Sequence, residues 1–257
     1  MTHPYFEKTA HPRVFAHRGL VTEQGGASGV WENTAAAFAA AHAAGVEYIE
    51  TDCQVTADGD VILFHDSTLT RLTGDHRAVR EVSTRELADL FADHGGLLTV
   101  SDALASFPSS RFNIDVKTRD AAEPLGAILA DHVDRVLVTS FDDTNRRATI
   151  SAVLRAGAGL RPATSGGSRT IAAVRALSAL RLSPARVLRD VDALQIPVRH
   201  GRLRVLTPVL LDAAHRFGVE VHVWTVNDPS DMRRLVDLGV DGIVSDRADL
   251  AVETLSA

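Results

Sequence analysis

The chain has 257 residues, of which 45% are hydrophobic, and a formal net charge of −6 at pH 7. That length suits one large α/β barrel or two small domains, and the acidic balance gives no general attraction to nucleic acid or anionic lipid. The single thiol, Cys53, excludes an intramolecular disulfide. No apolar stretch approaches the roughly 20 residues that cross a bilayer. We therefore expect a soluble, cytoplasmic protein without stable membrane insertion, and the sequence leaves its oligomeric state open.

Short apolar, β-branched runs alternate with alanine-rich amphipathic segments along almost the whole chain. This alternation predicts parallel strands joined by helical crossovers. We expect strands at residues 13–16, 46–54, 111–116, 136–139, 158–161, 193–196, 219–224 and 242–244. The helices that we expect between them include residues 34–44, 84–91, 142–154, 169–180, 208–217 and 229–238.

Eight such units favour a single (β/α)₈ TIM barrel over a doubly wound sheet, because no G-x-G-x-x-G pattern follows the first strand. We place the barrel domain at residues 13–257, after a polar N-terminal extension at residues 1–12 that has no apolar core for a secretory signal. Residues 60–65 are expected to form a short extra strand after the second. The long segment from Ser67 to Val100 is a small excursion that we expect to help form a substrate pocket.

The first strand delivers an imidazole and a guanidinium to its C-terminal tip, where barrel enzymes keep their active sites. These side chains belong to His17 and Arg18, and Gly19 follows where the backbone turns away. Together they form a proton-transfer group beside an anion clamp. The alternative is that both are ordinary polar residues at a strand end, which this motif alone does not exclude.

Carboxylates collect on the second and third strands. Glu50 and Asp52 are two residues apart, so both point to the same face, and we expect that face to be the barrel interior. Two buried carboxylates this close need a proton or a cation. Because Asp115 supplies a third strand-borne carboxylate, a bound divalent cation is favoured over the alternative of a salt bridge with an arginine.

Asp115 shares one strand face with Asn113 and Lys117. This face offers a metal ligand and, one step further along, an ammonium for a phosphoryl or carboxyl oxygen. Lysine occurs only at Lys8 and Lys117, so an interior lysine in this arginine-rich chain indicates a position that needs a compact ammonium. Oxygen ligands without a cysteine cluster or a His-rich spacing predict one Mg²⁺ or Ca²⁺ ion rather than zinc.

His65 supplies a second imidazole after the apolar run at residues 61–64. Two histidines around a metal-bound anion can act as general base and general acid for a displacement at phosphorus. Taken alone, a histidine after an apolar run is more often a capping or packed residue. His65 is a catalytic candidate because, together with His17, it gives the chain a pair of imidazoles for general base and general acid.

Taken in order, these motifs resemble the glycerophosphodiester phosphodiesterase family. Each motif is weak alone, but the ordered set is specific, and it runs from about Val14 to Arg247. The motifs are His17-Arg18-Gly19, Glu32-Asn33-Thr34, Glu50-Thr51-Asp52, His65-Asp66, Asn113-Ile114-Asp115-Val116-Lys117, Val223-Trp224-Thr225-Val226-Asn227 and Asp241-Gly242-Ile243-Val244-Ser245-Asp246.

The resemblance implies a (β/α)₈ barrel and a set of site roles. It assigns Glu50, Asp52 and Asp115 as ligands of one divalent cation, His17 and His65 as the acid/base pair, and Arg18 and Lys117 as phosphate contacts. It also assigns Glu32 as a site glutamate that orients Arg18 or a histidine, and Trp224 as a pocket aromatic, for which barrel packing is an equal alternative. The family often has glutamate where this chain has Asp115, which leaves the identity and affinity of the metal open.

The expected function is metal-dependent hydrolysis of glycerophosphodiesters to glycerol 3-phosphate and an alcohol, through a cyclic phosphate. The alternatives are a lysophospholipase D or phospholipase C-like lipid phosphodiesterase of the same fold, a non-catalytic barrel that binds a phosphorylated metabolite, and a structural or interaction protein. The expected partner is a small-molecule glycerophosphodiester, not a nucleic acid. Residues 164–169 and 197–204 are expected to join the segment from Ser67 to Val100 in the pocket wall. The basic run Val198–Arg202 either attracts a second anionic group or is a solvated loop, and the solvated loop is favoured.

Overall fold

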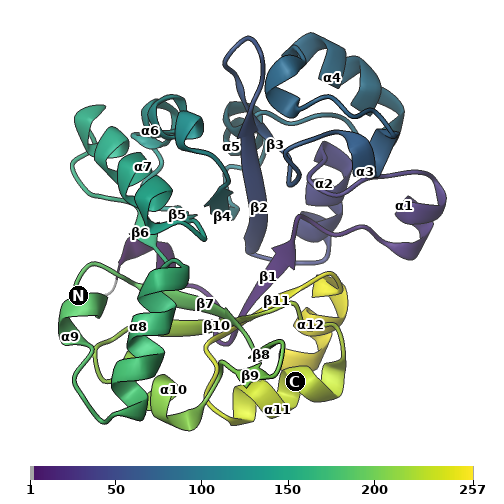
Figure 1. The fold of residues 1–257 in the computed structure, drawn as a ribbon. Helices are drawn as coiled ribbons and strands as arrows, with labels where there is room; N and C mark the ends of the chain where they lie inside the picture. The colour runs from purple at the N-terminus through teal and green to yellow at the C-terminus, as the bar shows by residue number, and fades with distance from the viewer. Residues whose placement is uncertain (1–2, 257) are drawn as a thin grey trace.

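The computed structural model describes residues 3–256 and shows eight parallel strands in the order β6-β5-β4-β2-β1-β11-β10-β7 (Figure 1). A parallel bridge between Ser165 and Ala193 joins the two ends of this order, and the Gly166 amide donates to the Ala193 carbonyl at 3.0 Å. The sheet is therefore a nearly closed (β/α)₈ barrel, as the sequence predicts. Its strands are β1 (Arg13–His17), β2 (Tyr48–Val55), β4 (Arg111–Val116), β5 (Val136–Thr139), β6 (Ala163–Thr164), β7 (Ala193–Pro197), β10 (Glu220–Trp224) and β11 (Gly242–Ser245).

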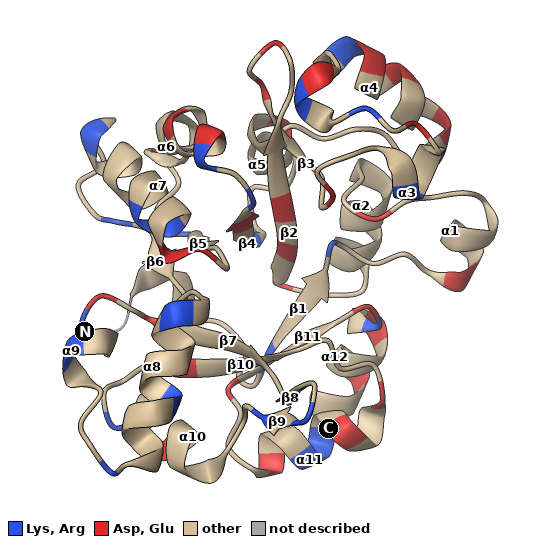
Figure 2. Cartoon of the chain, viewed as in Figure 1, with Lys and Arg blue, Asp and Glu red and all other residues tan. Residues whose placement is uncertain are grey.

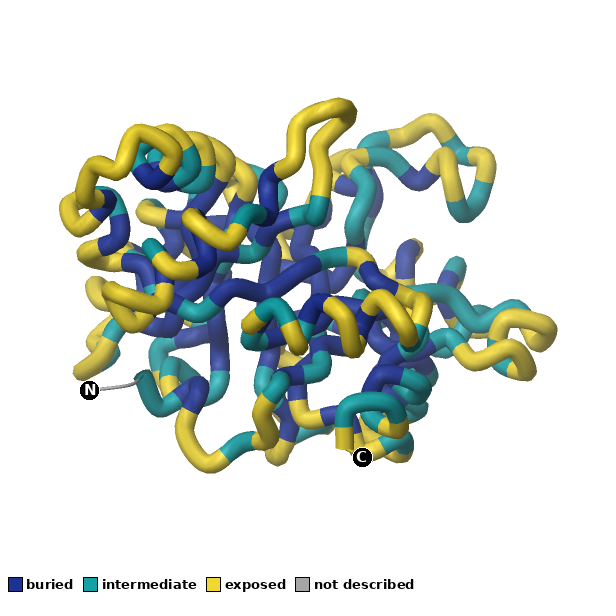
Figure 3. The backbone as a smooth tube through the Cα atoms, turned by 90° about the horizontal axis from the view of Figure 1, so that it is seen from below, coloured by how far each residue is buried: buried dark blue, intermediate teal, exposed yellow. Residues whose placement is uncertain are grey.

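Helices surround the strands, so that the barrel wall is buried while the outer loops are exposed (Figure 3). Side-chain caps explain where several of them begin: the Thr34 and Thr207 hydroxyls each accept a hydrogen bond from the backbone amide three residues further along the chain. No helix in residues 3–256 is both long enough and apolar enough to span a bilayer. The longer helices are α2 (Ala35–Ala43), α4 (Thr84–Phe91), α5 (Val100–Ser106), α6 (Ala122–Leu129), α7 (Asp143–Arg155), α8 (Ser168–Ala179), α10 (Pro208–His215), α11 (Pro229–Asp237) and α12 (Ala248–Leu255).

The strand predicted at residues 158–161 is wrong. Residues 158–161 are irregular, and the strand is the shorter β6, which pairs with β5 through Leu137 to Ala163 and Val138 to Thr164. Pro162 separates the apolar run from the paired residues and has no amide hydrogen to give to a ladder. A strand of two residues is too short to produce a periodic pattern, so the sequence offered only the longer run before it.

The excursion after β2 forms a small layer of its own. It follows β3 (Val61–Leu63), which runs antiparallel to β2 and confirms the predicted extra strand. The short helix α3 (Thr70–Thr73) and then α4 follow, and Leu69, Leu87 and Phe91 are buried together beneath them. Other short elements are α1 (Glu23–Ala27), α9 (Ala185–Leu188) and the hairpin of β8 (Arg199–His200) and β9 (Leu203–Arg204).

A buried ion pair lies where the barrel strands begin. The Arg13 guanidinium donates to both Glu220 oxygens at 2.7 Å, and the fully buried His222 places Nε2 3.0 Å from Glu220 Oε2. Tyr5 and Phe6, from the segment before β1, are buried in the same cluster as strand residues. Burial opposes ionisation of Glu220, but the hydrogen bonds from Arg13 and His222 outweigh it and lower its pKa to about 2.

Glu220→Gln is expected to lower the free energy of unfolding by roughly 3 kcal/mol at pH 7, because it leaves the buried Arg13 guanidinium without its counter-ion. In an unfolded chain a glutamate titrates near pH 4.3. The contribution of ionised Glu220 to the free energy of unfolding is therefore fully present above that pH and is lost as the pH falls through its folded pKa of about 2. Urea unfolding should therefore show a larger difference in free energy of unfolding between the parent and the Glu220→Gln variant at pH 7 than at pH 3. The exposed Glu253→Gln on α12 is the control, and a Glu220 variant as stable as the parent at pH 7 would contradict the prediction.

Candidate active site

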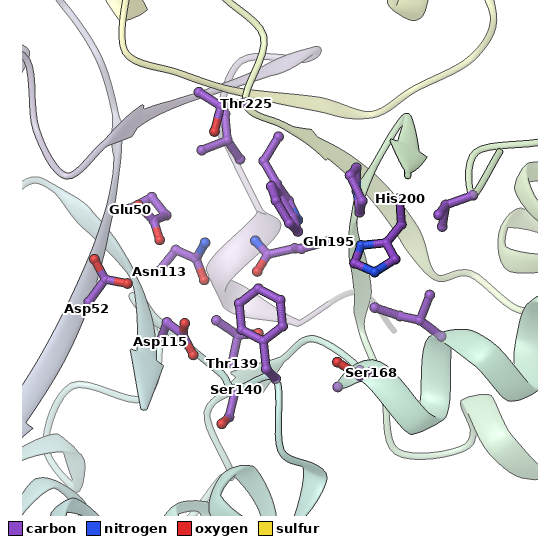
Figure 4. A pocket seen from close by; sticks show the side chains of 18 of the residues that line it. Glu50, Asp52, Asn113, Asp115, Thr139, Ser140, Ser168, Gln195, His200 and Thr225 are labelled. Carbon is purple, nitrogen blue, oxygen red and sulfur yellow. The ribbon is translucent and has the colours of Figure 1, made fainter. Parts of the chain in front are cut away.

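A cavity of about 470 Å³ lies at the carboxyl ends of the barrel strands. Figure 4 shows the side chains of Glu50, Asp52 and Asp115 at one side of it, and those of Ser168 and His200 at the other. The sequence singled out nine site residues, and the structure brings eight of them to this cavity: His17, Arg18, Glu50, Asp52, His65, Asp115, Lys117 and Trp224. Glu32 does not line the cavity, but it accepts a hydrogen bond from Arg18, which does.

His17 is the last residue of β1, and its ring is held by a carboxylate that follows β11. Nδ1 lies 2.6 Å from Asp246 Oδ1, and Asn227 Nδ2 donates to the other Asp246 oxygen at 2.8 Å. Nε2 lies 3.9 Å from Glu50 Oε2. Burial favours the neutral ring, but the hydrogen bond to Asp246 and the charge of Glu50 outweigh it and raise the pKa of His17. A proton on Nδ1 directed at Asp246 leaves Nε2 as the nitrogen that faces the site.

His65, just after β3, is held in the same way. Its Nδ1 lies 2.7 Å from Asp66 Oδ1, and Arg71 Nε donates to Asp66 Oδ2 at 2.6 Å. Burial opposes ionisation of Asp66, but its hydrogen bonds with His65 and Arg71 outweigh burial and lower its pKa. An ionised carboxylate at Nδ1 leaves Nε2 of His65 available to a ligand.

The excursion does not form the pocket wall that the sequence predicted. Among the described residues, none between 67 and 100 lines the cavity. The excursion supports the site from behind, because Arg71 on α3 also donates to Glu32 Oε1 at 2.6 Å. The same Glu32 oxygen accepts from Arg18 Nη1 at 2.8 Å. Arg71 therefore links the guanidinium of Arg18 to the imidazole of His65 through two carboxylates.

The β2 and β4 carboxylates of Asp52 and Asp115 are buried, that of Glu50 is partly exposed, and the group is incompletely neutralised. Burial and the neighbouring charge of Asp52 raise the pKa of Glu50 to about 8. Burial also raises the pKa of Asp115, although Lys117 lies beside it. In residues 3–256 the buried oxygens Asp115 Oδ1 and Asn113 Oδ1 have no hydrogen-bond partner. These two oxygens are therefore free to bind a cation or to accept a hydrogen bond from a ligand.

Two side-chain cations contact part of this group. Lys117 Nζ lies 2.7 Å from Asp52 Oδ1 and 2.6 Å from Asp115 Oδ2, and Arg18 Nε lies 3.3 Å from Asp52 Oδ2. Burial disfavours the charged lysine, but the two carboxylates outweigh it and raise its pKa. The arginine salt bridge that the sequence left as an alternative is therefore present at Asp52. Glu50 forms no ion pair with a lysine or arginine side chain among the described residues, and it accepts the Arg18 backbone amide at 3.2 Å.

The donor set fits a hard divalent cation in its chemistry. Three carboxylates and an unpartnered amide oxygen are the ligands that Mg²⁺ and Ca²⁺ prefer. Glu50, Asp52 and Asp115 are the residues that would hold such an ion. Across residues 3–256, no three His, Cys, Asp or Glu side chains are already gathered as a metal-binding group. The Lys117 ammonium contacts one oxygen of Asp52 and one of Asp115.

Aromatic side chains form another part of the wall. Trp224, at the end of β10, has its ring 5.9 Å from that of Phe141, and the two rings meet edge to face. Lys117 Nζ lies 5.8 Å from the Phe141 ring centre. Sequence reasoning gave no role to Phe141, Asp246 or Asp66. The available signal was position, since Phe141 and Asp246 follow the ends of β5 and β11, where barrel enzymes keep their functional groups.

The barrel and the groups gathered at its carboxyl end place this chain among the (β/α)₈-barrel enzymes. Residues 17–250 match the profile of the glycerophosphoryl diester phosphodiesterase family, and the chain belongs to that family of phosphoric diester hydrolases.

Individual relatives agree with this assignment. The chain is 34% identical over 250 residues to the probable glycerophosphodiester phosphodiesterase 2 of Mycobacterium tuberculosis, covering 95% of this chain and 90% of that protein. The crystal structure of a glycerophosphodiester phosphodiesterase from Thermotoga maritima matches with a TM-score of 0.73 at 24% identity, covering 95% of this chain and 99% of that one. An Oleispira antarctica phosphodiesterase in complex with the product sn-glycerol-3-phosphate matches with a TM-score of 0.72 at 19% identity, covering 96% and 98%. The solved structures establish the fold, and the sequence match establishes the family.

Proposed function

We propose that this protein hydrolyses glycerophosphodiesters to glycerol 3-phosphate and an alcohol. The observation that carries the proposal is one cavity that holds two imidazoles, His17 and His65, each fixed at Nδ1 by a carboxylate. The same cavity contains cationic side chains for a phosphate and carboxylates for a divalent ion. Membership of the family and the product bound to the Oleispira relative support the substrate class.

The two histidines would move protons in opposite directions. One removes the proton from the substrate glycerol hydroxyl next to the phosphodiester, and that oxygen attacks phosphorus. The bond from phosphorus to the alcohol oxygen breaks, and the other histidine protonates the departing alkoxide. Water then opens the cyclic phosphate with the two roles reversed. Attack from within the substrate gains an effective molarity of ~10⁵–10⁸ M, which favours this route over direct attack by water.

Arg18 and Lys117 would bind the phosphoryl oxygens, where charge increases as phosphorus is attacked. Glu32 fixes the Arg18 guanidinium, and the carboxylates of Asp52 and Asp115 keep the Lys117 ammonium in the cavity wall. A divalent cation held by Glu50, Asp52 and Asp115 would supply further Lewis-acid stabilisation of the same charge. His17 Nε2 lies 3.9 Å from Glu50 Oε2, one of these proposed ligands.

Metal removal tests this function directly. We expect EDTA to abolish glycerol 3-phosphate release from glycerophosphocholine, glycerophosphoethanolamine and glycerophosphoinositol, and added Mg²⁺ or Ca²⁺ to restore it. The release is followed with a coupled glycerol 3-phosphate dehydrogenase assay. Turnover of lysophospholipids without turnover of these diesters would replace the proposal with a lipid phosphodiesterase. Binding of the diesters without turnover under any metal condition would identify a non-catalytic barrel.

A further inference from the structure

Arg71, on α3 of the excursion, lies outside the cavity wall but binds two carboxylates that reach it. Its Nε donates to Asp66 Oδ2 at 2.6 Å, and its Nη2 donates to Glu32 Oε1 at 2.6 Å. Arg71 does not line the cavity, and its side chain is 45% exposed. Figure 2 shows a basic position on α3, the helix that carries this arginine. Arg71 can therefore affect the chemistry only through the groups that its two carboxylates hold.

Each of these carboxylates fixes one side chain of the cavity wall. Asp66 places its other oxygen, Oδ1, 2.7 Å from His65 Nδ1. Glu32 Oε1 accepts from Arg18 Nη1 at 2.8 Å as well as from Arg71. His65 follows β3 and Arg18 follows β1, so the two side chains come from different parts of the barrel. One guanidinium thus stands behind both a proposed proton-transfer group and a proposed phosphate contact.

The backbone that carries Arg71 is anchored at both ends of α3. Leu69, immediately before the helix, is fully buried and packs in one cluster with Phe64. Gly74 ends the helix with a φ of 78°, in the left-handed region that favours glycine, and its amide donates to the Thr70 carbonyl at 3.0 Å. The guanidinium therefore extends from a fixed support toward the two carboxylates.

The charge of Arg71 keeps Asp66 in the form that orients the imidazole. Burial opposes ionisation of Asp66, but its hydrogen bonds with His65 and Arg71 outweigh burial and lower its pKa. An ionised carboxylate only accepts hydrogen bonds, so it holds the proton of the His65 ring on Nδ1 and leaves Nε2 for the substrate. Without Arg71, the bond to His65 is the one side-chain hydrogen bond left to Asp66 within residues 3–256. Asp66 and the ring it holds would then be free to turn.

A second arginine of the excursion has the same surroundings but a different place. Arg77 also has a side-chain exposure of 45%, and its Nη2 lies 2.6 Å from both Asp75 Oδ2 and Glu86 Oε1. In the part of the chain that the structure describes, neither Asp75 nor Glu86 forms a hydrogen bond or an ion pair with a residue of the cavity wall. Arg71 and Arg77 therefore differ in what their carboxylates hold, while their charge, exposure and number of ion pairs agree.

We propose that Arg71 is a positioning residue that holds His65 and Arg18 in place for the reaction at phosphorus. This inference rests on the proposed function and adds to it a residue outside the cavity. A guanidinium suits the role because its planar fork directs donors at two carboxylates at once. Groups that carry out chemistry must be held within about 0.5 Å of their productive positions, and the contacts behind them provide this.

The test compares Arg71→Gln with Arg77→Gln, the matched control. We expect Arg71→Gln to lower kcat/KM for glycerophosphocholine by about 10²-fold, the usual effect of displacing a catalytic group by about 1 Å. Arg77→Gln should keep the activity of the parent. Both variants should unfold in urea at the same midpoint, because ion pairs of half-exposed side chains contribute little to stability.

Two further measurements distinguish positioning from a structural role. In ¹⁵N NMR spectra of histidine-labelled protein, the His65 signals are those missing from His65→Asn. With the ring neutral, they should show the proton on Nδ1 in the parent and in Arg77→Gln, and a mixture of both tautomers in Arg71→Gln. Calorimetry should show that Arg71→Gln binds glycerol 3-phosphate more weakly than the parent, because Arg18 is no longer fixed.

The outcomes separate this inference from the function beneath it. Unchanged His65 tautomers together with unchanged affinity for glycerol 3-phosphate in Arg71→Gln overturn the proposal, even if activity falls, since the role of Arg71 is then structural. A change in one of these two readouts overturns the proposal for the other group. If the parent hydrolyses no glycerophosphodiester, the proposed function fails. The His65 signals of the parent and of Arg71→Gln then decide by themselves whether Arg71 positions the imidazole.

Discussion

Replacing His17 with asparagine is expected to lower kcat for glycerophosphodiester hydrolysis by about 10²–10⁴-fold, the usual contribution of a general acid or base. Asparagine keeps a donor that can reach Asp246, whose Oδ1 lies 2.6 Å from the imidazole, but it cannot exchange a proton at neutral pH. The loss should therefore fall on kcat, with little change in KM. His65→Asn should behave alike, and the exposed His42→Asn on α2 is the matched control.

The pH dependence of the two variants assigns the roles. The pKa of His17 is raised, since the bond to Asp246 and the charge of Glu50 outweigh the opposing effect of burial. If His17 is the initial base, activity of the parent rises with pH through this raised pKa. If it is the initial acid, activity falls there. Each variant should lose one limb of a bell-shaped profile of kcat/KM. Unchanged kcat in both variants would rule out acid/base catalysis by this pair.

Glu50→Gln is expected to stabilise the metal-free protein and to abolish its stabilisation by Mg²⁺ or Ca²⁺. Burial and the charge of Asp52 raise the pKa of Glu50 to about 8, whereas an unfolded glutamate titrates near pH 4.3. A folded pKa above the unfolded one means that stability falls as the pH rises from about 4.3 to about 8. At pH 7 most of this penalty is present, on the order of 3 kcal/mol, and a neutral amide avoids it.

Thermal unfolding of both proteins in EDTA and in excess metal measures the two effects. With metal at 100 times its dissociation constant, the parent should gain about 3 kcal/mol and the variant much less, because a ligand stabilises only the state that binds it. Glu253→Gln, on the exposed face of α12, is the control for loss of a carboxylate. Equal stabilisation of variant and parent by metal would remove Glu50 from the ligand set. Lower stability of the variant in EDTA would contradict the account of a buried charge.

The sequence predicted the barrel and most of the cavity because both depend on short-range regularities. Side chains alternate along a strand, so residues two apart share a face, which places Glu50 with Asp52 and Asp115 with Lys117 in the cavity wall. Helix–strand alternation predicted the parallel pairing of the strands. Where the pattern was too short, at Ala163–Thr164, the strand was misplaced.

The partners of the site residues depend on contacts between distant segments. Asp52 and Asp115 face each other in the register of β2 and β4, and this register lets Lys117 bridge them. Asp246 reaches His17 across 229 residues of sequence. Arg71 turns the excursion into a support for the site, although the sequence suggested a pocket wall.

By itself, then, the sequence determined the fold class, the inward faces of the strands and the set of chemical groups at their ends, because periodicity and residue type are local properties. Only the tertiary structure decided which carboxylate holds which imidazole, which cation neutralises Asp52, and which wall closes the cavity. Those choices follow from strand register, barrel closure and the packing of α8 against the β8–β9 hairpin, where residues far apart in the chain come within hydrogen-bond distance.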